Sequence, residues 1–353
     1  MRKYFLGGNT PRGFYSYYDS LISQNEARKI YVIKGGPGTG KSTLMKAVSS
    51  FAVESGYNVD HIYCSSDPDS LDGLVIPEMK VAFVDGTSPH MVDPKSPGAV
   101  DTIVNLGDCW NEKNMRKNKE DIISINKKIS EKFSLSYDHL EAAGVLHNTA
   151  KKILSKVVDK ESLERTAGEI IFSEITEESP TGKAGQRKLF ASSYGPKGYI
   201  SFADTIGCSK KYVLRGYGTN AVLDKVAMAL MQYGYDTELF MNPLCPENEI
   251  LHLYVPELDL GIFTGESESG VTNAGGVVMD LSHLADRYLM DEYAQELDSI
   301  RRALSAQIKE ACDIIKEAKT LHDSLEKCYV PNMDFAKSLK IEEKIIKELE
   351  EMI

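Results

Sequence analysis

The stretch "KIYVIKGGPGTGKSTLMKAV", residues 29–48, decides the fold of the first half of this chain. Four β-favouring residues, "IYVI", lead into a glycine-rich turn and then into a run that favours a helix. The turn has the spacing G-x-x-x-x-G-K-S between Gly35 and Ser42. The full pattern between a strand and a helix predicts a phosphate-binding loop rather than a chance glycine turn.

Each residue type in this loop has a physical role. Glycines adopt backbone conformations closed to residues with a Cβ, so successive N–H groups can point inward and cradle phosphate oxygens. The helix that follows directs the positive end of its dipole at the same anion. We expect Lys41 to reach the β- and γ-phosphates, and Ser42 to coordinate a magnesium ion. The predicted nucleotide-binding residues are Gly36, Pro37, Gly38, Thr39, Gly40, Lys41, Ser42 and Thr43.

Composition limits the class of protein. The 353 residues are enough for two domains, and 42% hydrophobic with 26% charged residues is ordinary for a globular protein. The net charge of −11 argues against nucleic-acid binding, and we interpret the basic segment 113–119 as a solvated helix face. The six cysteines form no C-x-x-C pair, and we find neither an apolar signal core nor a run approaching 18 apolar residues. These features predict a reduced, cytoplasmic protein without a membrane span.

The chain contains an internal repeat. "KYFLGGNTPRGFYSYYDSLI" from Lys3 is echoed by "KLFASSYGPKGYISFADTIG" from Lys188. The match continues in order, since "IYVIKGGPGTG" pairs with "KYVLRGYGTN", and "IPEMKVAFVDGT" with "VPELDLGIFTGE". We therefore predict an α/β fold with two tandem P-loop NTPase-like units, each a mostly parallel sheet flanked by helices. The predicted boundaries are 1–178 for the first unit, 179–187 for a polar linker and 188–353 for the second unit.

Each unit is predicted to end in a long amphipathic helix and a shorter one, the shorter ones within residues 161–175 and 334–353. The long runs exceed the usual ~10 to 14 residues of a globular helix. They either pack on the sheets and on each other, or form arms that bind a protein partner or make a homodimer.

The second copy has lost the residues that phosphate chemistry needs. By our alignment, Asn220, Ala221 and Val222 take the places of the glycine, lysine and serine that end the first loop, within one residue. Gly216 and Gly218 still permit a turn, but the cation and the metal ligand are gone. We interpret the first unit as competent and the second as degenerate. The alternative is a second site that binds nucleotide without turning it over.

An acidic residue is expected to accompany the loop. Residues 81–84, "VAFV", suit a buried parallel strand, and Asp85 follows at its carboxyl end, where ligands of α/β sheets gather. We expect Asp85 to hold the magnesium ion directly or through water. Thr264 stands at the matching place in the second half, so the aspartate is lost together with the lysine and serine. The alternative is a simple strand-end turn with Gly86.

A second acidic cluster lies in "YCSSDPDSLDG", where Asp67, Asp69 and Asp72 are predicted to emerge at the same sheet edge. We select Asp67 as the candidate that positions the attacking water or binds the metal through water. The alternative is that these acids serve only as turn formers or helix caps. We interpret His90 as a surface loop residue.

Several segments together resemble a little-characterised family of bacterial tandem P-loop ATPases, found chiefly in Firmicutes. They are "FLGGNTPRGFYS", "IKGGPGTGKSTLMK", "CSSDPDSLDG", "IPEMKVAFVDGTSPH" and "VDPKSPGAVDTIVNLGD". The resemblance covers most of residues 1–110 strongly and the second half only as a diverged copy. It implies ATP binding and hydrolysis but no substrate or process. Members of that family can carry a second intact loop, so the decayed copy here puts a two-site mechanism in doubt.

The favoured function is a Mg²⁺-dependent ATPase with one competent site, in which Lys41, Asp85 and Asp67 are the catalytic candidates. A GTPase is disfavoured because "NKKI" at 126–129 lacks the aspartate of N-K-x-D. The alternatives are a small-molecule or nucleotide phosphotransferase and a non-hydrolysing, nucleotide-gated interaction protein. If the halves face each other, Arg215 or Lys197 is expected near the first site as a charge donor.

Overall fold

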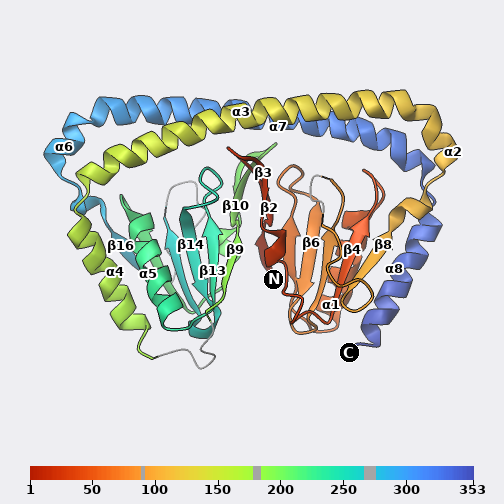
Figure 1. Ribbon diagram of the computed structural model, residues 1–353, viewed down its shortest axis with the longest axis horizontal. Helices are drawn as coiled ribbons and strands as arrows, with labels where there is room; N and C mark the ends of the chain where they lie inside the picture. Colours follow the sequence, from red (N-terminus) through yellow and green to blue (C-terminus); the bar gives the residue numbers. More distant parts are fainter. Residues whose placement is uncertain (89–91, 178–183, 266–275) are drawn as a thin grey trace.

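The computed structural model describes residues 1–88, 92–177, 184–265 and 276–353. Two six-stranded sheets stand side by side, and two long helices run over both of them (Figure 1). This arrangement confirms the α/β class and the two mostly parallel sheets that the repeat predicts. Within the described ranges, no helix is long and apolar enough to cross a membrane.

The first sheet places the phosphate-loop strand near one edge. Its strands, in spatial order, are β1 (Arg2–Tyr4), β5 (Asp60–Tyr63), β6 (Leu71–Ile76), β7 (Val81–Asp85), β4 (Lys29–Lys34) and β8 (Asp101–Asn105). All pairings are parallel except those of β6, which runs antiparallel to β5 and to β7. A hairpin of β2 (Gly7–Thr10) and β3 (Gly13–Ser16) stands beside the sheet.

The second sheet repeats this order. Its strands, in the corresponding order, are β9 (Gln186–Leu189), β13 (Thr237–Met241), β14 (Ile250–Val255), β15 (Leu260–Thr264), β12 (Lys210–Arg215) and β16 (Val277–Asp280). The matching hairpin is β10 (Ser192–Gly195) with β11 (Gly198–Ser201). Strand β9 begins inside the predicted linker, and residues 179–183 of that linker lie outside the described ranges. The predicted unit boundaries therefore stay predictions.

The helices include the predicted long helix and shorter helix at the end of each half. They are α1 (Lys41–Glu54), α2 (Glu112–Met115), α3 (Lys119–Val157), α4 (Lys160–Glu174), α5 (Thr219–Gln232), α6 (Arg287–Glu292), α7 (Ala294–Tyr329) and α8 (Phe335–Glu350). Short 3-10 helices cover Tyr18–Ser20, Leu106–Cys109, Arg116–Asn118, Ala203–Thr205, Pro256–Leu258, Ser282–Leu284 and Val330–Asn332.

Strand β4, which lies between β7 and β8, is buried on both faces, as its apolar run requires. Tyr31 and Ile33 pack against helix α1 in one hydrophobic core. Ile30 and Val32 face the other core, which continues into the second half of the molecule. Burial on both sides holds the end of β4, and hence the loop that follows it, in a rigid frame.

The helical extensions are exchanged between the halves. We call helices α3 and α4 the first arm, and helices α7 and α8 the second arm. The first arm leaves the first sheet, crosses to the second, and packs α4 on α5; the second arm returns and packs α8 on α1 (Figure 1). Leu163 and Ile170 of α4 are buried with Val226 of α5, whereas Ile345 of α8 is buried with Val48 of α1. Each sheet is thus covered by a helix from the other half.

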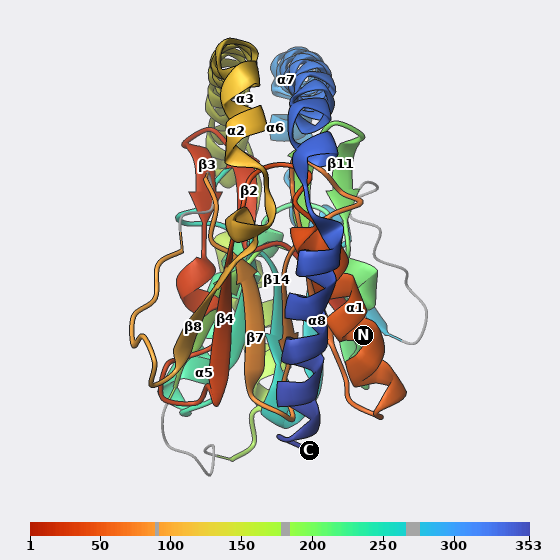
Figure 2. The same ribbon diagram turned by 90° about the vertical axis from the view of Figure 1, so that its right-hand side faces the viewer.

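The two arms pack against each other along their length. Helices α3 and α7 run as a pair above the sheets (Figure 2). Leu140 and Ala143 of α3 share a buried cluster with Ala311 and Cys312 of α7. The apolar faces of the long runs are therefore used within the chain, and an additional protein partner or a homodimer stays a prediction.

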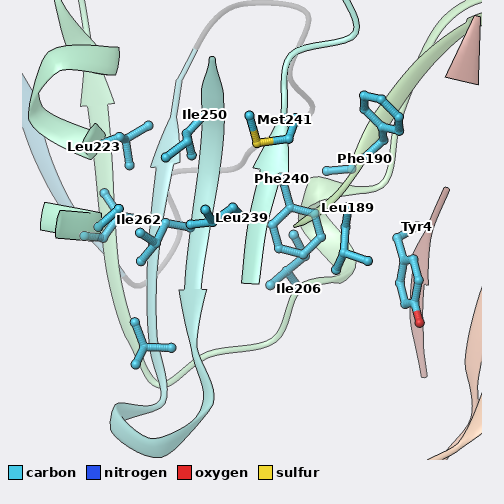
Figure 3. Close-up of a cluster of buried hydrophobic side chains, with 14 of the residues drawn as sticks. Tyr4, Leu189, Phe190, Ile206, Leu223, Leu239, Phe240, Met241, Ile250 and Ile262 are labelled. Atoms are coloured by element: carbon cyan, nitrogen blue, oxygen red, sulfur yellow. The ribbon is translucent and has the colours of Figure 1, made fainter. Parts of the chain in front are cut away.

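The sheets meet about an approximate two-fold axis. Phe5 and its repeat counterpart Phe190 form an antiparallel bridge, with N···O distances of 2.8 and 3.0 Å. Figure 3 shows Phe190 and Leu189 in the core of the second sheet, with Tyr4 of β1 alongside them. A residue that pairs with its own counterpart lies at the symmetry axis, so the axis passes between β1 and β9.

A buried charge cluster crosses the same boundary. Arg2 Nη2 lies 2.6 Å from Asp60 Oδ2, and Arg2 Nη1 lies 2.6 Å from Glu238 Oε2. Arg187 Nη1 lies 2.8 Å from Glu238 Oε1. Burial alone would raise the pKa of Glu238, but Arg2 and Arg187 outweigh it and lower that pKa. Glu238 therefore stays ionised and ties strands of both sheets together.

Candidate functional site

The predicted strand, loop and helix are present at the carboxyl end of β4. Residues 35–40 connect β4 to α1, and Lys41 is the first residue of the helix. Gly38 and Gly40 have φ angles of 66° and 89°, which L-residues with side chains rarely adopt. The glycines at these two positions thus allow the chain to curl as the pattern predicts.

The Lys41 side chain folds back into this loop. Its Nζ donates to the carbonyl oxygens of Gly35 and Gly36, both at 2.9 Å, and lies 3.5 Å from Asp85 Oδ2. The Lys41 and Asp85 side chains are 13% and 11% exposed. A shielded ammonium group that is held by weak carbonyl acceptors can exchange those partners for phosphate oxygens.

Asp85 is placed by its strand, as the sequence predicts. It ends β7 and pairs in register with Ile33 of β4. Its Oδ1 accepts a hydrogen bond from Thr87 N at 2.8 Å, while Thr87 Oγ1 donates to Gly35 O at 2.9 Å. The carboxylate and the start of the loop are therefore joined through Thr87.

The side chains predicted to hold magnesium suit that ion. Ser42 supplies a hydroxyl oxygen, which accepts from Leu71 N at 3.0 Å, and Asp85 supplies a carboxylate oxygen beside Lys41. Mg²⁺ prefers such oxygen ligands and keeps waters and substrate phosphates as its remaining ligands. In the described part of the chain, no group of three or more His, Cys, Asp or Glu side chains could hold a metal. Ser42 and Asp85 thus fit a metal that arrives with a nucleotide.

The three aspartates of the second acidic cluster differ in burial and in hydrogen-bond partners. Asp67 Oδ2 accepts from Ser70 Oγ at 2.9 Å, in the loop that leads to β6. Asp69 is exposed and binds Lys197 Nζ at 2.8 and 2.9 Å, which lowers the pKa of Asp69. Asp72 is buried as the second residue of β6, and it lies at the predicted sheet edge, because the next residue, Gly73, pairs with Val84, which precedes Asp85.

The second arm lies directly on the loop. A Cβ placed on Gly36 would be 2.6 Å from the Tyr329 ring, and one on Gly38 would be 2.7 Å from Val330 Cγ2. Glu326, one turn earlier in α7, is 3.5 Å from the same position on Gly38. Sequence reasoning missed these neighbours because they lie almost 300 residues from the loop. Only the exchange of arms brings them there.

A cavity opens beside the first residues of the loop. Its volume is about 470 Å³, within the size range of small-molecule sites. The lining residues come from the ends of β4, β7 and β8 and from the segments that follow them: Lys34, Gly35, Gly36, Gly86, Thr87, Ser88, Asp93, Asn105 and Trp110. The cavity is therefore contiguous with the loop at Gly35 and Gly36.

The second half has a shorter loop than the first. Only residues 216–218 connect β12 to α5, against residues 35–40 in the first half. Gly218 precedes α5 with φ 79°, as Gly40 precedes α1. The structural counterparts of Lys41 and Ser42 are therefore Thr219 and Asn220, which corrects the alignment made from sequence. The deletion shortens the loop from six residues to three and so removes backbone N–H groups that would cradle phosphate.

The loss of the aspartate is seen in the strand registers. Ile33 pairs with Asp85 in the first sheet, and its counterpart Leu214 pairs with Thr264 in the second. Leu163 of the first arm also packs against the loop, 2.6 Å from a Cβ placed on Gly218. The second sheet edge thus lacks the carboxylate and carries an apolar cover.

A buried ionic cluster fastens the first arm to this second edge. Glu249, with a 3% exposed side chain, lies 3.0 Å from His147 Nε2 and 2.6 Å from Lys151 Nζ. Asn242 Nδ2 also donates to Glu249, at 2.7 Å. Burial alone would raise the pKa of Glu249, but His147 and Lys151 lower it to about 2. The carboxylate therefore stays charged and the arm stays docked at neutral pH.

The other predicted residues are placed as follows. Lys197 reaches the first half from hairpin β10–β11 and binds Asp69, so its ammonium group lies at the rim of the acidic loop. Arg215 ends β12 and packs beside Gly265, so it belongs to the second sheet edge and not to the first site. His90 lies outside the described residues.

The chain matches no protein-family profile, no curated protein and no solved structure. The site is therefore interpreted from its own geometry.

Proposed function

We propose that this protein binds ATP with Mg²⁺ at a single site in its first half and hydrolyses it. The observation that carries the proposal is the position of Lys41 Nζ, between the carbonyls of the glycine loop and Asp85. The resemblance of residues 1–110 to tandem P-loop ATPases supports the same reading.

The proposed roles follow from the contacts. Backbone N–H groups of Gly36 and of residues 38–43 bind the phosphates, and Lys41 exchanges its carbonyl partners for phosphate oxygens. Ser42 and Asp85 hold the magnesium ion, which, when bound, neutralises charge on the phosphate oxygens. Asp67, in the loop beside Ser42, is the candidate that orients the attacking water.

A phosphotransferase is the second candidate, and the cavity favours it. The space of about 470 Å³ adjoins Gly35 and Gly36 and has Thr87 and Ser88 in its wall. A small acceptor in this cavity would compete with water for the terminal phosphate. Hydrolysis without added acceptor supports the ATPase, whereas ATP consumption that depends on an acceptor supports the transferase.

Replacing Asp85 by Asn tests the metal-binding role. We expect Mg²⁺-dependent hydrolysis to fall at least about 100-fold, because a neutral amide is a poor ligand for a hard cation. ATP affinity should change less than tenfold, since the loop amides and Lys41 bind the phosphates independently of this carboxylate. Magnesium titrations of turnover and of ATP binding measure both effects. Unchanged hydrolysis across the titration would move the metal role to Asp67 or Asp72.

The number of sites is tested by calorimetry on the full chain. A non-hydrolysable ATP analogue should bind with a stoichiometry near one, because the second loop lacks three residues of the first and has Thr219 in place of the lysine. Thr219→Ala is the matched control and should leave stoichiometry and affinity unchanged. Two equivalent sites, or a loss of binding in Thr219→Ala, would contradict the single-site assignment.

A further inference from the structure

A row of polar side chains on the second arm follows the first-half loop. Lys319, His322 and Glu326 recur at intervals of three and four residues, so they share one face of α7. Glu326 lies at Gly38, as described above, and Lys319 Nζ lies 3.4 Å from Asp67 Oδ2. The row therefore extends from the loop glycines to the acidic loop that ends at β6.

Lys319 is connected to Ser42, a magnesium ligand of the proposed site, by a short chain of contacts. Leu71 N, at the end of the acidic loop, donates to Ser42 Oγ at 3.0 Å. Ser70 Oγ, one residue earlier, donates to Asp67 Oδ2 at 2.9 Å, and Lys319 contacts that same oxygen. A terminal phosphate bound beside Ser42 would thus be separated from the Lys319 ammonium group by one short loop. Because a lysine side chain has a flexible four-carbon stem, the ammonium group can move from its present position to such a phosphate.

The present partners of Lys319 are replaceable. Its Nζ lies 2.5 Å from Asp323 Oδ1 and 3.4 Å from Asp67 Oδ2, and its side chain is 26% exposed. The pair with Asp323 is an (i, i+4) contact on a helix surface, and such contacts stabilise a helix only weakly. A triphosphate carries more negative charge than either carboxylate and can therefore displace both.

The second half supplies an internal comparison. Trp110 bridges Met333, and Ala285 bridges Val158 in the same antiparallel manner. Each pair of counterparts is separated by 175 residues (285 − 110 and 333 − 158). The same shift relates the two arms.

With an offset of 175 residues, Gly144 of the first arm corresponds to Lys319 of the second arm. The first arm therefore presents no cation at this position of the second edge, where Thr219 replaces Lys41. Over the shortened loop the first arm instead supplies Lys151, seven residues beyond Gly144, and that lysine binds Glu249.

We propose that Lys319 of the second arm is a second phosphate-binding cation of the first-half site and contacts the terminal phosphate of bound ATP. This inference rests on the proposed function. In this proposal both halves of the chain contribute to the site: the first half supplies the loop, and the arm of the second half supplies Lys319.

The test compares Lys319→Ala with Lys309→Ala in the full chain. Lys309 lies on the same helix and makes the same (i, i+4) contact, 2.5 Å from Asp313, but is 76% exposed. Calorimetry with ADP and with a non-hydrolysable ATP analogue separates the terminal phosphate from the rest of the nucleotide. We expect Lys319→Ala to weaken binding of the analogue by about 10- to 100-fold, as expected for a charge-assisted hydrogen bond, and ADP binding by less than threefold. Lys319→Arg should restore part of the loss.

The possible results are distinct. If the wild-type chain binds no nucleotide, the proposed function is wrong and this inference falls with it. If the wild type binds the analogue but Lys319→Ala and Lys309→Ala behave alike, only the assignment of Lys319 is wrong. Equal losses for ADP and the analogue would also overturn it, because they would indicate a structural role.

Discussion

Lys41→Ala is expected to abolish ATP turnover, by at least about 100-fold, while the chain stays folded. The ammonium group lies where the loop N–H groups and the helix dipole converge, so its loss removes the charge that grips the phosphates. Its present partners are two backbone carbonyls and Asp85, and none of them belongs to a hydrophobic core. Steady-state phosphate release, with circular dichroism and thermal unfolding on the same samples, measures both parts of the expectation.

Thr219→Ala is the natural control for this variant. Thr219 begins α5 as Lys41 begins α1, so the two substitutions shorten side chains at corresponding positions of the repeat. Turnover should be unchanged in Thr219→Ala. Equal hydrolysis by the wild type and well-folded Lys41→Ala would rule out the loop as the catalytic site.

Local patterns in the sequence were sufficient to predict the frame of the site. The loop between β4 and α1 and the place of Asp85 depend on residues that are close in sequence or on adjacent parallel strands. The repeat likewise predicted two sheets, because several segments of the first half recur in the same order 179 to 185 residues later. Such features depend on local backbone geometry and on periodicity, and both can be recognised in a single sequence.

The exchange of arms could not be predicted in this way. The amphipathic patterns of α3 and α7 show that each helix has an apolar face, but not which sheet it covers. Both α1 and α5 bury an apolar face, so the apolar pattern around Leu163 does not indicate which of the two helices α4 covers. Consequently the contacts of Tyr329, Val330 and Lys319 with the first site appear only in three dimensions.

The sequence alignment of the two loops failed for a different reason. Three residues are missing from the second loop, and the sequence alone does not say where the gap lies. The left-handed glycine before each helix resolves this, because Gly40 and Gly218 mark the same structural position.

The arginine–carboxylate cluster between the sheets leads to the largest expected effect on stability. Glu238→Ala should lower the free energy of unfolding by about 3 kcal/mol, near the lower end of the range for breaking a buried ion pair. The side chain of Glu238 is 9% exposed, and it binds Arg2 and Arg187, which are 25% and 27% exposed. Removing the carboxylate leaves both guanidinium groups partly desolvated, whereas Arg2 keeps Asp60 as a partner. Urea unfolding at neutral pH measures the difference.

A matched control is Glu164→Ala, which breaks an exposed ion pair with Lys225 between α4 and α5. The side chains of that pair are 64% and 51% exposed, so its loss should cost less than about 1 kcal/mol. Equal effects of Glu164→Ala and Glu238→Ala would show that the cluster at the two-fold axis contributes no more than a surface contact.

The pH dependence of the stability of Glu238→Gln tests whether ionised Glu238 stabilises the native state. Arg2 and Arg187 hold the pKa of Glu238 below its ordinary value of 4.5, so the native state favours the ionised form more than the unfolded chain does. This contribution to stability is complete above pH about 4.5 and is lost as the pH falls through the lowered pKa. Glu238→Gln cannot titrate, so its deficit against the wild type should be constant at neutral pH and shrink below pH 4.5. A deficit that grows on acidification would mean that Glu238 is not the ionised partner of the two arginines.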